Sequence, residues 1–172
     1  MSTTFALLVG FLVLAILAYR QRHRLKRREE NWGGEALRGK RLIFSERVFR
    51  SRRTGIVAKI DRGYLADGSI HLLEFKTRRR HRVYPADIIE LSAQRVAVQG
   101  DDGRQVADAG YVLTENERDG SRLLHEVRLL SEDALLRLRD RRAMILGGRL
   151  PPREASAPGL CKGCAYRVEC KK

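Results

Sequence analysis

Aromatic residues are scarce in this sequence, and acidic residues are fewer than basic ones. Phe, Trp and Tyr make up 6% of the 172 residues, which gives little sign of the aromatic surface on which many proteins stack the bases of single strands. The 21 acidic residues are outnumbered by 35 Lys and Arg, so the formal net charge is +14. This charge favours a polyanionic partner, either nucleic acid or an anionic membrane surface. The length excludes two large globular domains, although the 43% of apolar residues suffices for one modest core.

A long uncharged run lies near the first residue. The sequence FALLVGFLVLAILAY covers residues 5–19, and with Thr3 and Thr4 it reaches roughly the 17 residues that a membrane-spanning helix needs. A cleaved signal peptide is the alternative, but no basic residue precedes Phe5, and RQRHRLKRR follows instead of the small residues of a cleavage site. We therefore predict a retained transmembrane helix over residues 1–19.

Basic residues dominate the first part of the next segment, residues 20–40. Because such residues flank the cytoplasmic end of a membrane helix, we expect a single-pass protein of the inner or cytoplasmic membrane with its body in the cytoplasm. The basic part is interpreted as a topology signal and a contact for anionic lipids, with an arm that holds DNA as the alternative. The sequence EENWGGEALRGK that follows is typical of a linker.

Cysteine is absent until the last twelve residues, where Cys161, Cys164 and Cys170 follow a Pro-containing stretch in the tail, residues 149–172. An odd number of thiols in a reducing compartment favours metal ligands or free thiols over a disulfide framework. The C-x-x-C spacing suits zinc or an iron-sulfur cluster, although three ligands are one short of a complete site. Several alternatives remain open for this triplet. It could hold a cluster with a non-cysteine fourth ligand, form a zinc site completed by His or a carboxylate, belong to a site shared between subunits, or be a decayed site.

The body of the chain, residues 41–148, alternates strand-like and helix-like patterns. Residues rich in β-branched and aromatic side chains predict strands, and the Asp67-Gly68 pair predicts a hairpin turn. Pro85 and Asp87 are typical of a helix start, and the helix is expected to end near Gly100. The predicted α/β fold has a mixed sheet with flanking helices, from strands 41–49, 54–65 and 66–76, a helix 85–100, strands 109–115 and 121–130, and a helix 132–146.

The ends and faces of the two helices follow from their residues. In the first helix Ala86, Ile89, Ala93, Val96 and Ala97 fall on one side, which we expect to pack on the sheet. The second helix has Ser131 as its predicted cap, and Gly147 and Gly148 are expected to terminate it.

A carboxylate and a lysine alternate on the third strand. Glu74 and Lys76 project to one face, while Phe75 points to the other. Asp61 is predicted to end the preceding strand, from where pairing would bring its carboxylate beside Glu74. Two carboxylates and the main-chain carbonyl of Phe75 would suit Mg²⁺ or Mn²⁺, with Lys76 orienting a water or stabilising a phosphate transition state. The alternative is that all three are ordinary solvent-facing charges.

The segments GIVAKID, LLEFKT and LSAQRVAVQ resemble the motifs of the PD-(D/E)XK nuclease superfamily, in particular RecB-type and CRISPR-associated exonucleases with a C-terminal cysteine cluster. The resemblance covers about residues 41 to 170. It implies a metal-dependent exodeoxyribonuclease in which Asp61 and Glu74 bind the metal, Lys76 is the catalytic lysine and Gln94 is the polar residue of the following helix. Gly55 matches a glycine that is common ahead of the Asp strand.

The sequence departs from this family pattern at three places. The family usually takes a further metal ligand from an upstream helix, where this chain offers Glu35. Val98 stands where relatives often have Tyr. The C-terminal thiols resemble the triplet of a 4Fe-4S cluster whose fourth cysteine lies near the start of the domain, but no cysteine precedes Cys161. Gln94 lies at the flank of the predicted apolar stripe, where a structural hydrogen bond explains it equally well.

A basic run follows the Glu-x-Lys strand directly. Arg78, Arg79, Arg80 and Arg82, with His81 among them, are expected to hold nucleic-acid phosphates beside the metal, largely without sequence preference. A solvated loop is the alternative. The leading hypothesis is a membrane-anchored, metal-dependent nuclease acting on DNA. The alternatives are a non-catalytic nucleic-acid-binding or adaptor protein that retains the nuclease fold, and a scaffold at the membrane surface.

Overall fold

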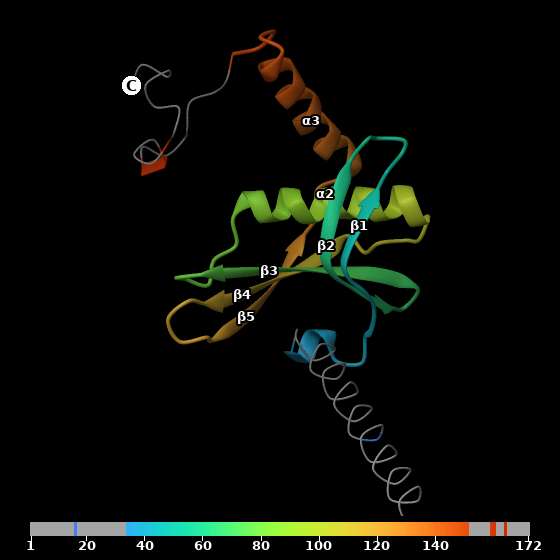
Figure 1. The fold of residues 1–172 in the computed structure, drawn as a ribbon, viewed down its shortest axis with the longest axis vertical. Helices are drawn as coiled ribbons and strands as arrows, with labels where there is room; N and C mark the ends of the chain where they lie inside the picture. Colours follow the sequence, from blue (N-terminus) through green and yellow to red (C-terminus); the bar gives the residue numbers. More distant parts are fainter. Residues whose placement is uncertain (1–15, 17–33, 152–158, 161–163, 165–172) are drawn as a thin grey trace, which may run out of the picture. The chain divides into compact units, whose positions relative to one another are not determined.

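The computed structural model describes residue 16, residues 34–151, residues 159–160 and residue 164 (Figure 1). The chain divides into two compact units, Met1–Leu135 and Leu136–Lys172. Apart from residue 16, the predicted transmembrane segment 1–19 lies outside the described residues, as do residues 20–33. Among the helices that the structure describes, none combines the length and the apolar character needed to cross a bilayer.

The first unit is built on a five-stranded mixed sheet, which confirms the predicted α/β architecture. Strands β1 to β5 lie side by side in chain order. The pairings are antiparallel except that of β3 with β4, which is parallel. The strands are β1 (Arg41–Arg50), β2 (Val57–Ala66), β3 (Ser69–Arg78), β4 (Ala109–Asn116) and β5 (Arg122–Arg128).

A two-residue turn fixes the register between β2 and β3. Ala66 pairs with Ser69, and between them Asp67 and Gly68 have φ angles of 49° and 75°. Positive φ at both central positions is the geometry of the type I′ hairpin, for which Asp-Gly is a preferred sequence. The predicted turn is therefore confirmed.

Asp61 lies within β2 and does not end it, so that part of the prediction is wrong. The strand continues to Ala66, five residues further. The ladder between β2 and β3 runs from the turn to the pair Arg62 and Leu73. Asp61 and Glu74 are the next residues on the two strands, and they stand where this ladder stops.

The parallel pairing of β3 and β4 requires a crossover, which helix α2 (Pro85–Asp102) supplies. Asp87 accepts a hydrogen bond of 2.7 Å from the backbone N–H of Tyr84 at the start of the helix. Gly103, with φ of 73°, ends it. The helix is two residues longer than the predicted end at Gly100.

The predicted apolar face of α2 is only partly right. Val96 and Ala97 are buried, but Ala86 and Ile89 are exposed. The helix instead turns Leu91 toward the sheet, together with polar residues described below. The physical reason is that polar partners on β3 receive the polar side chains of the helix, so hydrophobic spacing alone does not decide its orientation.

Two apolar clusters cover the two faces of the sheet. Figure 1 shows α2 on one side of β3, β4 and β5, and the short 3₁₀ helix η1 (Gly34–Leu37) on the other. On the α2 side, the buried cluster consists of Phe44, Phe49, Ile60, Ile70, Leu72, Leu91, Ala97, Val98, Val106, Val112 and Leu129. On the η1 side, the smaller cluster consists of Leu37, Tyr64, Leu73, Tyr111 and Leu113, with Phe75 packed against it.

Helix α3 (Glu132–Leu146) matches its predicted residues. Its first turn is capped as expected, because the Ser131 hydroxyl accepts a hydrogen bond of 3.2 Å from the N–H of Ala134. At the other end, Gly148 has φ of 70° and terminates the helix as predicted.

Candidate active site

The carboxylate of Asp61 lies against the backbone of β3. Its Oδ2 atom accepts a hydrogen bond of 2.8 Å from the N–H of Phe75, the residue between Glu74 and Lys76. Phe75 itself packs on the η1 side of the sheet, so its neighbours Glu74 and Lys76 project toward α2. The structure thus brings Asp61, Glu74 and Lys76 together at the point where β2 and β3 separate.

Glu74 is a buried carboxylate with two hydrogen-bond donors. Only 4% of the residue is exposed. Its Oε2 accepts a hydrogen bond of 2.6 Å from Gln94 Nε2, and its Oε1 lies 2.6 Å from Lys76 Nζ. Burial raises the pKa of Glu74, and the charge of Asp61 adds to this; the bonds from Lys76 and Gln94 oppose the rise without cancelling it.

Lys76 bridges two carboxylates. Its Nζ atom contacts Glu90 Oε2 at 2.8 Å in addition to Glu74. Burial lowers the pKa of Lys76, but the hydrogen bonds and charges of Glu74 and Glu90 outweigh burial, so the pKa is raised. The side chain is therefore a cation at neutral pH, suited to stabilising negative charge on a phosphate rather than to accepting a proton.

Gln94 is central to the α2 face and does not lie at its flank. It is 1% exposed, and its Nε2 also donates to the carbonyl of Lys59 at 3.2 Å. Among the described residues its Oε1 atom has no hydrogen-bond partner. The prediction that Gln94 belongs to the site thus has a geometric basis, because its amide group donates hydrogen bonds both to the Glu74 carboxylate on β3 and to the backbone of β2. Val98, the departure from the family pattern, is fully buried one turn further on.

Three polar pairs join β3 to α2. Glu74, Lys76 and Arg78 follow one another on alternate positions of β3, and Gln94, Glu90 and Asp87 follow in reverse order along α2. Two residues of a strand span about 6.6 Å, and three or four residues of a helix span about 4.5–6 Å. The polar residues of β3 and those of α2 are therefore spaced closely enough to pair one with one. We call this set of six residues the β3–α2 polar ladder.

Sequence reasoning missed Glu90 and the partnership of Asp87. The signal was present, because E-x-K-x-R on a strand and D-x-x-E-x-x-x-Q on the next helix each place three polar groups on one face. The hydrophobic pattern alone does not predict that these two polar faces pair with each other.

Within the basic run, the arginines differ in their surroundings. The guanidinium of Arg78 is bound by both oxygens of Asp87, at 2.5 and 2.8 Å. Arg79 and Arg80 are exposed, and Arg79 lies 3.6 Å from Glu117 in a loose, exposed ion pair. Arg79, Arg80 and the exposed Arg82 are thus more open to a ligand than Arg78 is.

An aromatic residue, Tyr84, accompanies the basic run and was not singled out from the sequence. It is 45% exposed. The guanidinium carbons of Arg78 and Arg82 lie 4.7 and 5.4 Å from the centre of its ring, which are cation–π distances. Tyr84 thus holds the side chain of Arg82 near that of Arg78.

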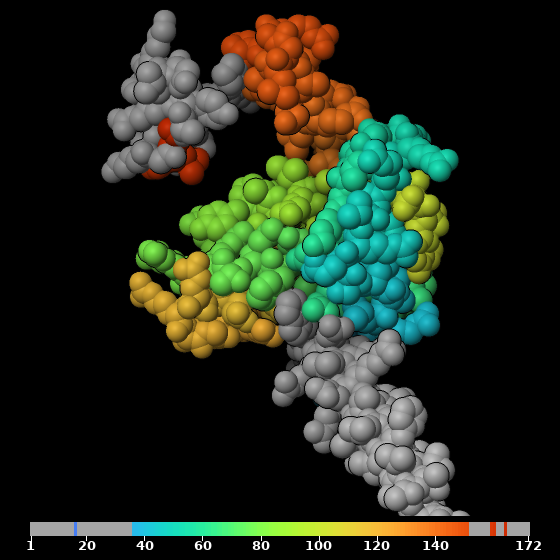
Figure 2. All heavy atoms as spheres, viewed as in Figure 1, coloured from blue at the N-terminus to red at the C-terminus, as the bar shows by residue number. Residues whose placement is uncertain are grey.

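His81 ties the basic run to the neighbouring β4–β5 hairpin. Its Nδ1 lies 2.8 Å from Thr114 Oγ1 and its Nε2 lies 3.0 Å from Ser121 Oγ. The backbone N–H of Glu117 also donates to the carbonyl of Arg78 at 3.0 Å. Figure 2 shows the end of β3, in green, beside this hairpin, in amber.

The oxygen donors fit a hard divalent cation. Asp61 and Glu74 are carboxylates close enough for the charge of Asp61 to raise the pKa of Glu74, and a cation beside them would relieve this repulsion. In the described part of the chain, no group of three or more His, Cys, Asp or Glu side chains forms a complete metal cage. Remaining ligands would have to come from the main chain, such as the Phe75 carbonyl, and from water.

Other predicted ligands cannot be placed in the same way. The backbone of Glu35 lies in η1, but its side chain is outside what the structure describes. Cys161 and Cys170 also fall outside the described residues, and Cys164 is an exposed free thiol. Gly55 lies in the turn between β1 and β2, with φ of 71°.

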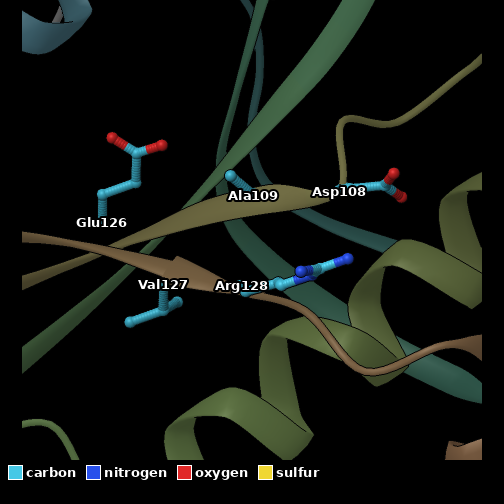
Figure 3. A pocket seen from close by; sticks show the side chains of 5 residues that line it. All are labelled: Asp108, Ala109, Glu126, Val127 and Arg128. Atoms are coloured by element: carbon cyan, nitrogen blue, oxygen red, sulfur yellow. The ribbon is translucent and has the colours of Figure 1, made fainter.

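A separate pocket opens at the first residues of β4 and the last residues of β5 (Figure 3). It encloses about 490 Å³ and is lined by Asp108, Ala109, Glu126, Val127 and Arg128. No predicted site residue belongs to it, and in Figure 3 the Glu126 side chain points away from that of Val127. The chemistry therefore centres on the β3–α2 polar ladder.

The mixed five-stranded sheet with its crossover helix is consistent with an α/β nuclease core, and the Asp, Glu-x-Lys and Gln set lies where two of its strands separate. The family model of the PD-(D/E)XK nuclease superfamily matches residues 8–171, and the chain belongs to this superfamily. Its members are generally nucleases and typically use Mg²⁺ or Mn²⁺.

A search of curated proteins finds no match. Among solved structures, the chain is similar to the one titled "Crystal structure of SSO0001", with a TM-score of 0.45 and 15% sequence identity. The similarity covers 90% of this chain and 79% of that chain.

Proposed function

We propose that this protein is a metal-dependent nuclease that hydrolyses DNA phosphodiester bonds with little sequence preference. The observation that carries the proposal is the placement of Asp61, Glu74 and Lys76 around one point, with Gln94 fixing Glu74. As a finer proposal, the enzyme is an exodeoxyribonuclease of RecB type, anchored by residues 1–19 in the cytoplasmic membrane with its catalytic domain in the cytoplasm.

Each residue of the set has a chemical task in this proposal. Asp61, Glu74 and the Phe75 carbonyl would hold Mg²⁺ or Mn²⁺. When bound, the ion would lower the pKa of a coordinated water and neutralise charge on the phosphate. Lys76, as an ammonium group, would donate hydrogen bonds to a phosphate oxygen or to the attacking water. Gln94 would keep the Glu74 carboxylate in one orientation.

The exposed members of the basic run would bind the substrate backbone. Arg79, Arg80 and Arg82 follow directly after the strand that carries Lys76, so a phosphate chain bound there would pass close to the site. Arg78 is proposed to contribute mainly by positioning the run, because Asp87 already occupies its guanidinium. Contacts to phosphates alone carry no sequence information, which accounts for the proposed lack of preference.

The proposal is tested with the full chain, labelled single-stranded and double-stranded DNA, and Mg²⁺, Mn²⁺ or EDTA. We expect metal-dependent cutting that falls to a small residual rate in Glu74→Ala and Lys76→Ala and is retained in Lys59→Ala. Lys59 is a suitable control because its side chain is an exposed lysine on the neighbouring strand, paired with Glu46. DNA binding without cutting in all four proteins would reject the nuclease and support the alternative, a nucleic-acid-binding adaptor.

The two terminal segments need their own tests. Resistance of the full chain to alkaline extraction from membranes, lost when residues 1–19 are removed, would support the anchor. For Cys161, Cys164 and Cys170 we propose an iron-sulfur cluster, with zinc as the alternative. Anaerobically purified protein should then absorb visible light, whereas a zinc site would leave it colourless and metal analysis would find zinc.

A further inference from the structure

Lys76 has one ammonium group and two carboxylate partners. Its Nζ lies 2.6 Å from Glu74 Oε1 and 2.8 Å from Glu90 Oε2. The side chain of Glu74 is 5% exposed and that of Glu90 is 47% exposed. One partner is therefore buried in the proposed metal site, and the other is half exposed to solvent.

The bond between Lys76 and Glu74 conflicts with metal binding. Both oxygens of Glu74 already accept hydrogen bonds, from Lys76 and from Gln94. A divalent ion at Glu74 would bring a second cation close to the ammonium in a poorly solvated place, where like charges repel strongly. Gln94 is neutral and can stay, so Lys76 is the group that must move.

Glu90 provides a second partner that does not depend on the metal. It lies one turn before Gln94 on α2, so both residues face β3. The start of this helix is fixed by the bidentate pair of Asp87 and Arg78. The Glu90 carboxylate is thus held by a rigid element while it remains outside the buried part of the site.

We propose that Glu90 is a positioning residue, which keeps the Lys76 ammonium at the reacting phosphate once Glu74 is occupied by the metal. This inference rests on the proposed nuclease function. In this scheme Lys76 pivots from Glu74 toward substrate while Glu90 limits its movement. Glu90 acts through Lys76 and does not bind the metal.

The test compares the full-length wild type with Glu90→Gln, Glu90→Asp and Asp101→Asn. Asp101 is an exposed acid near the other end of α2, so its variant loses the same charge from the same helix. We expect Glu90→Gln to lower kcat roughly 10-fold to 100-fold, the effect of misplacing a catalytic group by about 1 Å. The Mg²⁺ concentration at half-maximal rate should stay within about two-fold, Glu90→Asp should recover part of the rate, and Asp101→Asn should leave it unchanged.

A double-mutant cycle separates positioning from other roles. In a Lys76→Ala background, Glu90→Gln should cause no further loss, because the group on which Glu90 acts is gone. An equal loss in both backgrounds would overturn the proposal. So would an unchanged kcat in Glu90→Gln, or a raised Mg²⁺ requirement with kcat recovered at saturation, which would make Glu90 a ligand.

A second readout does not need catalysis. In protein with ¹⁵N-labelled lysine, the ammonium signal of Lys76, assigned with Lys76→Arg, should persist on addition of Mg²⁺ in wild type and Asp101→Asn. In Glu90→Gln it should disappear when Mg²⁺ is added, because rapid exchange with water follows loss of both partners. Identical responses in wild type and Glu90→Gln would refute the positioning role even if the protein cuts no DNA, whereas an inactive wild type would refute only the nuclease.

Discussion

Replacing Gln94 with leucine should destabilise the protein more at pH 8 than at pH 5. Gln94 is buried and donates to the Glu74 carboxylate at 2.6 Å. A hydrogen bond to a charged group contributes about 1.5–3 kcal/mol, and one between neutral groups about 0.5–1.5 kcal/mol. Leucine has a similar size, so the loss should come from the missing donor and not from a cavity. We expect about 2 kcal/mol at pH 8.

The pH dependence follows from the pKa of Glu74. Burial already raises this pKa above its ordinary value of 4.5, and the bond from Gln94 counteracts the rise. Without that bond the pKa rises further, so the folded variant releases its proton at higher pH than the folded wild type. The variant therefore loses stability relative to wild type as pH rises through this range. At pH 5, with Glu74 more fully protonated, the loss should be nearer 1 kcal/mol.

Thermal unfolding followed by circular dichroism at both pH values measures this effect. For a chain of this size, about 1 kcal/mol corresponds to roughly 2–4 °C in Tm, so a fall of roughly 4–8 °C is expected at pH 8 and about half of that at pH 5. Gln99→Leu is the matched control, because Gln99 is an exposed glutamine on the same helix. Equal losses at both pH values, or a loss no larger than that of the control, would refute the reasoning.

Two further predictions concern the frame that holds the site. In Gly63→Ala the new Cβ would lie 2.1 Å from the ring of Phe44, so we expect a loss of about 1–3 kcal/mol; Gly110→Ala, whose nearest neighbour would be Leu129 at 3.2 Å, should lose less in the same thermal assay. Burial raises the pKa of Asp87, but the bonds from Arg78 and from the N–H of Tyr84 outweigh it, so the pKa is lowered. The Asp87 carboxylate therefore contributes its full stabilisation at pH values above its pKa in the unfolded chain, about 3.9. This stabilisation is lost as pH falls through its lower pKa in the folded protein. Asp87→Asn should have a lower Tm than wild type at pH 6, and this difference in Tm should become smaller toward pH 2.5. Asp101→Asn should show no such pH-dependent difference. A difference in Tm for Asp87→Asn that stays constant with pH would contradict the stabilising role of the Asp87 carboxylate.

Much of the fold could be predicted because local chemistry specifies it. Alternating apolar residues identify the strands, and the Asp67-Gly68 pair specifies the hairpin that sets the register of β2 against β3. The same alternation places Glu74 and Lys76 on one face without any knowledge of tertiary structure. A helix after β3 follows from Pro85 and Asp87, and it is what a parallel return to β4 requires.

The orientation of α2 could not be predicted from hydrophobic spacing. That method assigns Ala86 and Ile89 to the core, but both are exposed, and the polar Gln94 is buried instead. A buried polar group is stable in that position only if the opposite element provides a hydrogen-bond partner. The partner is 20 residues away in the sequence, and its proximity depends on the crossover geometry of the folded chain.

The basic run shows a related limit. The sequence alone does not distinguish the arginines of this run, and their position beside Lys76 predicts phosphate binding for all of them. Strand alternation, however, continues to Arg78, which therefore joins the α2 face and pairs with Asp87. The run becomes a loop only after this residue, so its exposed charges begin at Arg79.

The β3–α2 polar ladder links the orientation of the helix to the proposed chemistry. At the turn end of β3, Ile70 and Leu72 contribute to the apolar cluster, while Glu74, Lys76 and Arg78 continue the same face with charged groups. A buried carboxylate with a raised pKa reduces stability at neutral pH. Such an arrangement persists in a folded protein when the apolar cluster offsets its cost, as is typical of functional sites. Replacing Glu74 and Gln94 together with apolar residues of similar size should therefore favour stability, in contrast to Gln94→Leu alone, which leaves the buried carboxylate without its donor. The gain would come only from removing a carboxylate that could bind a metal.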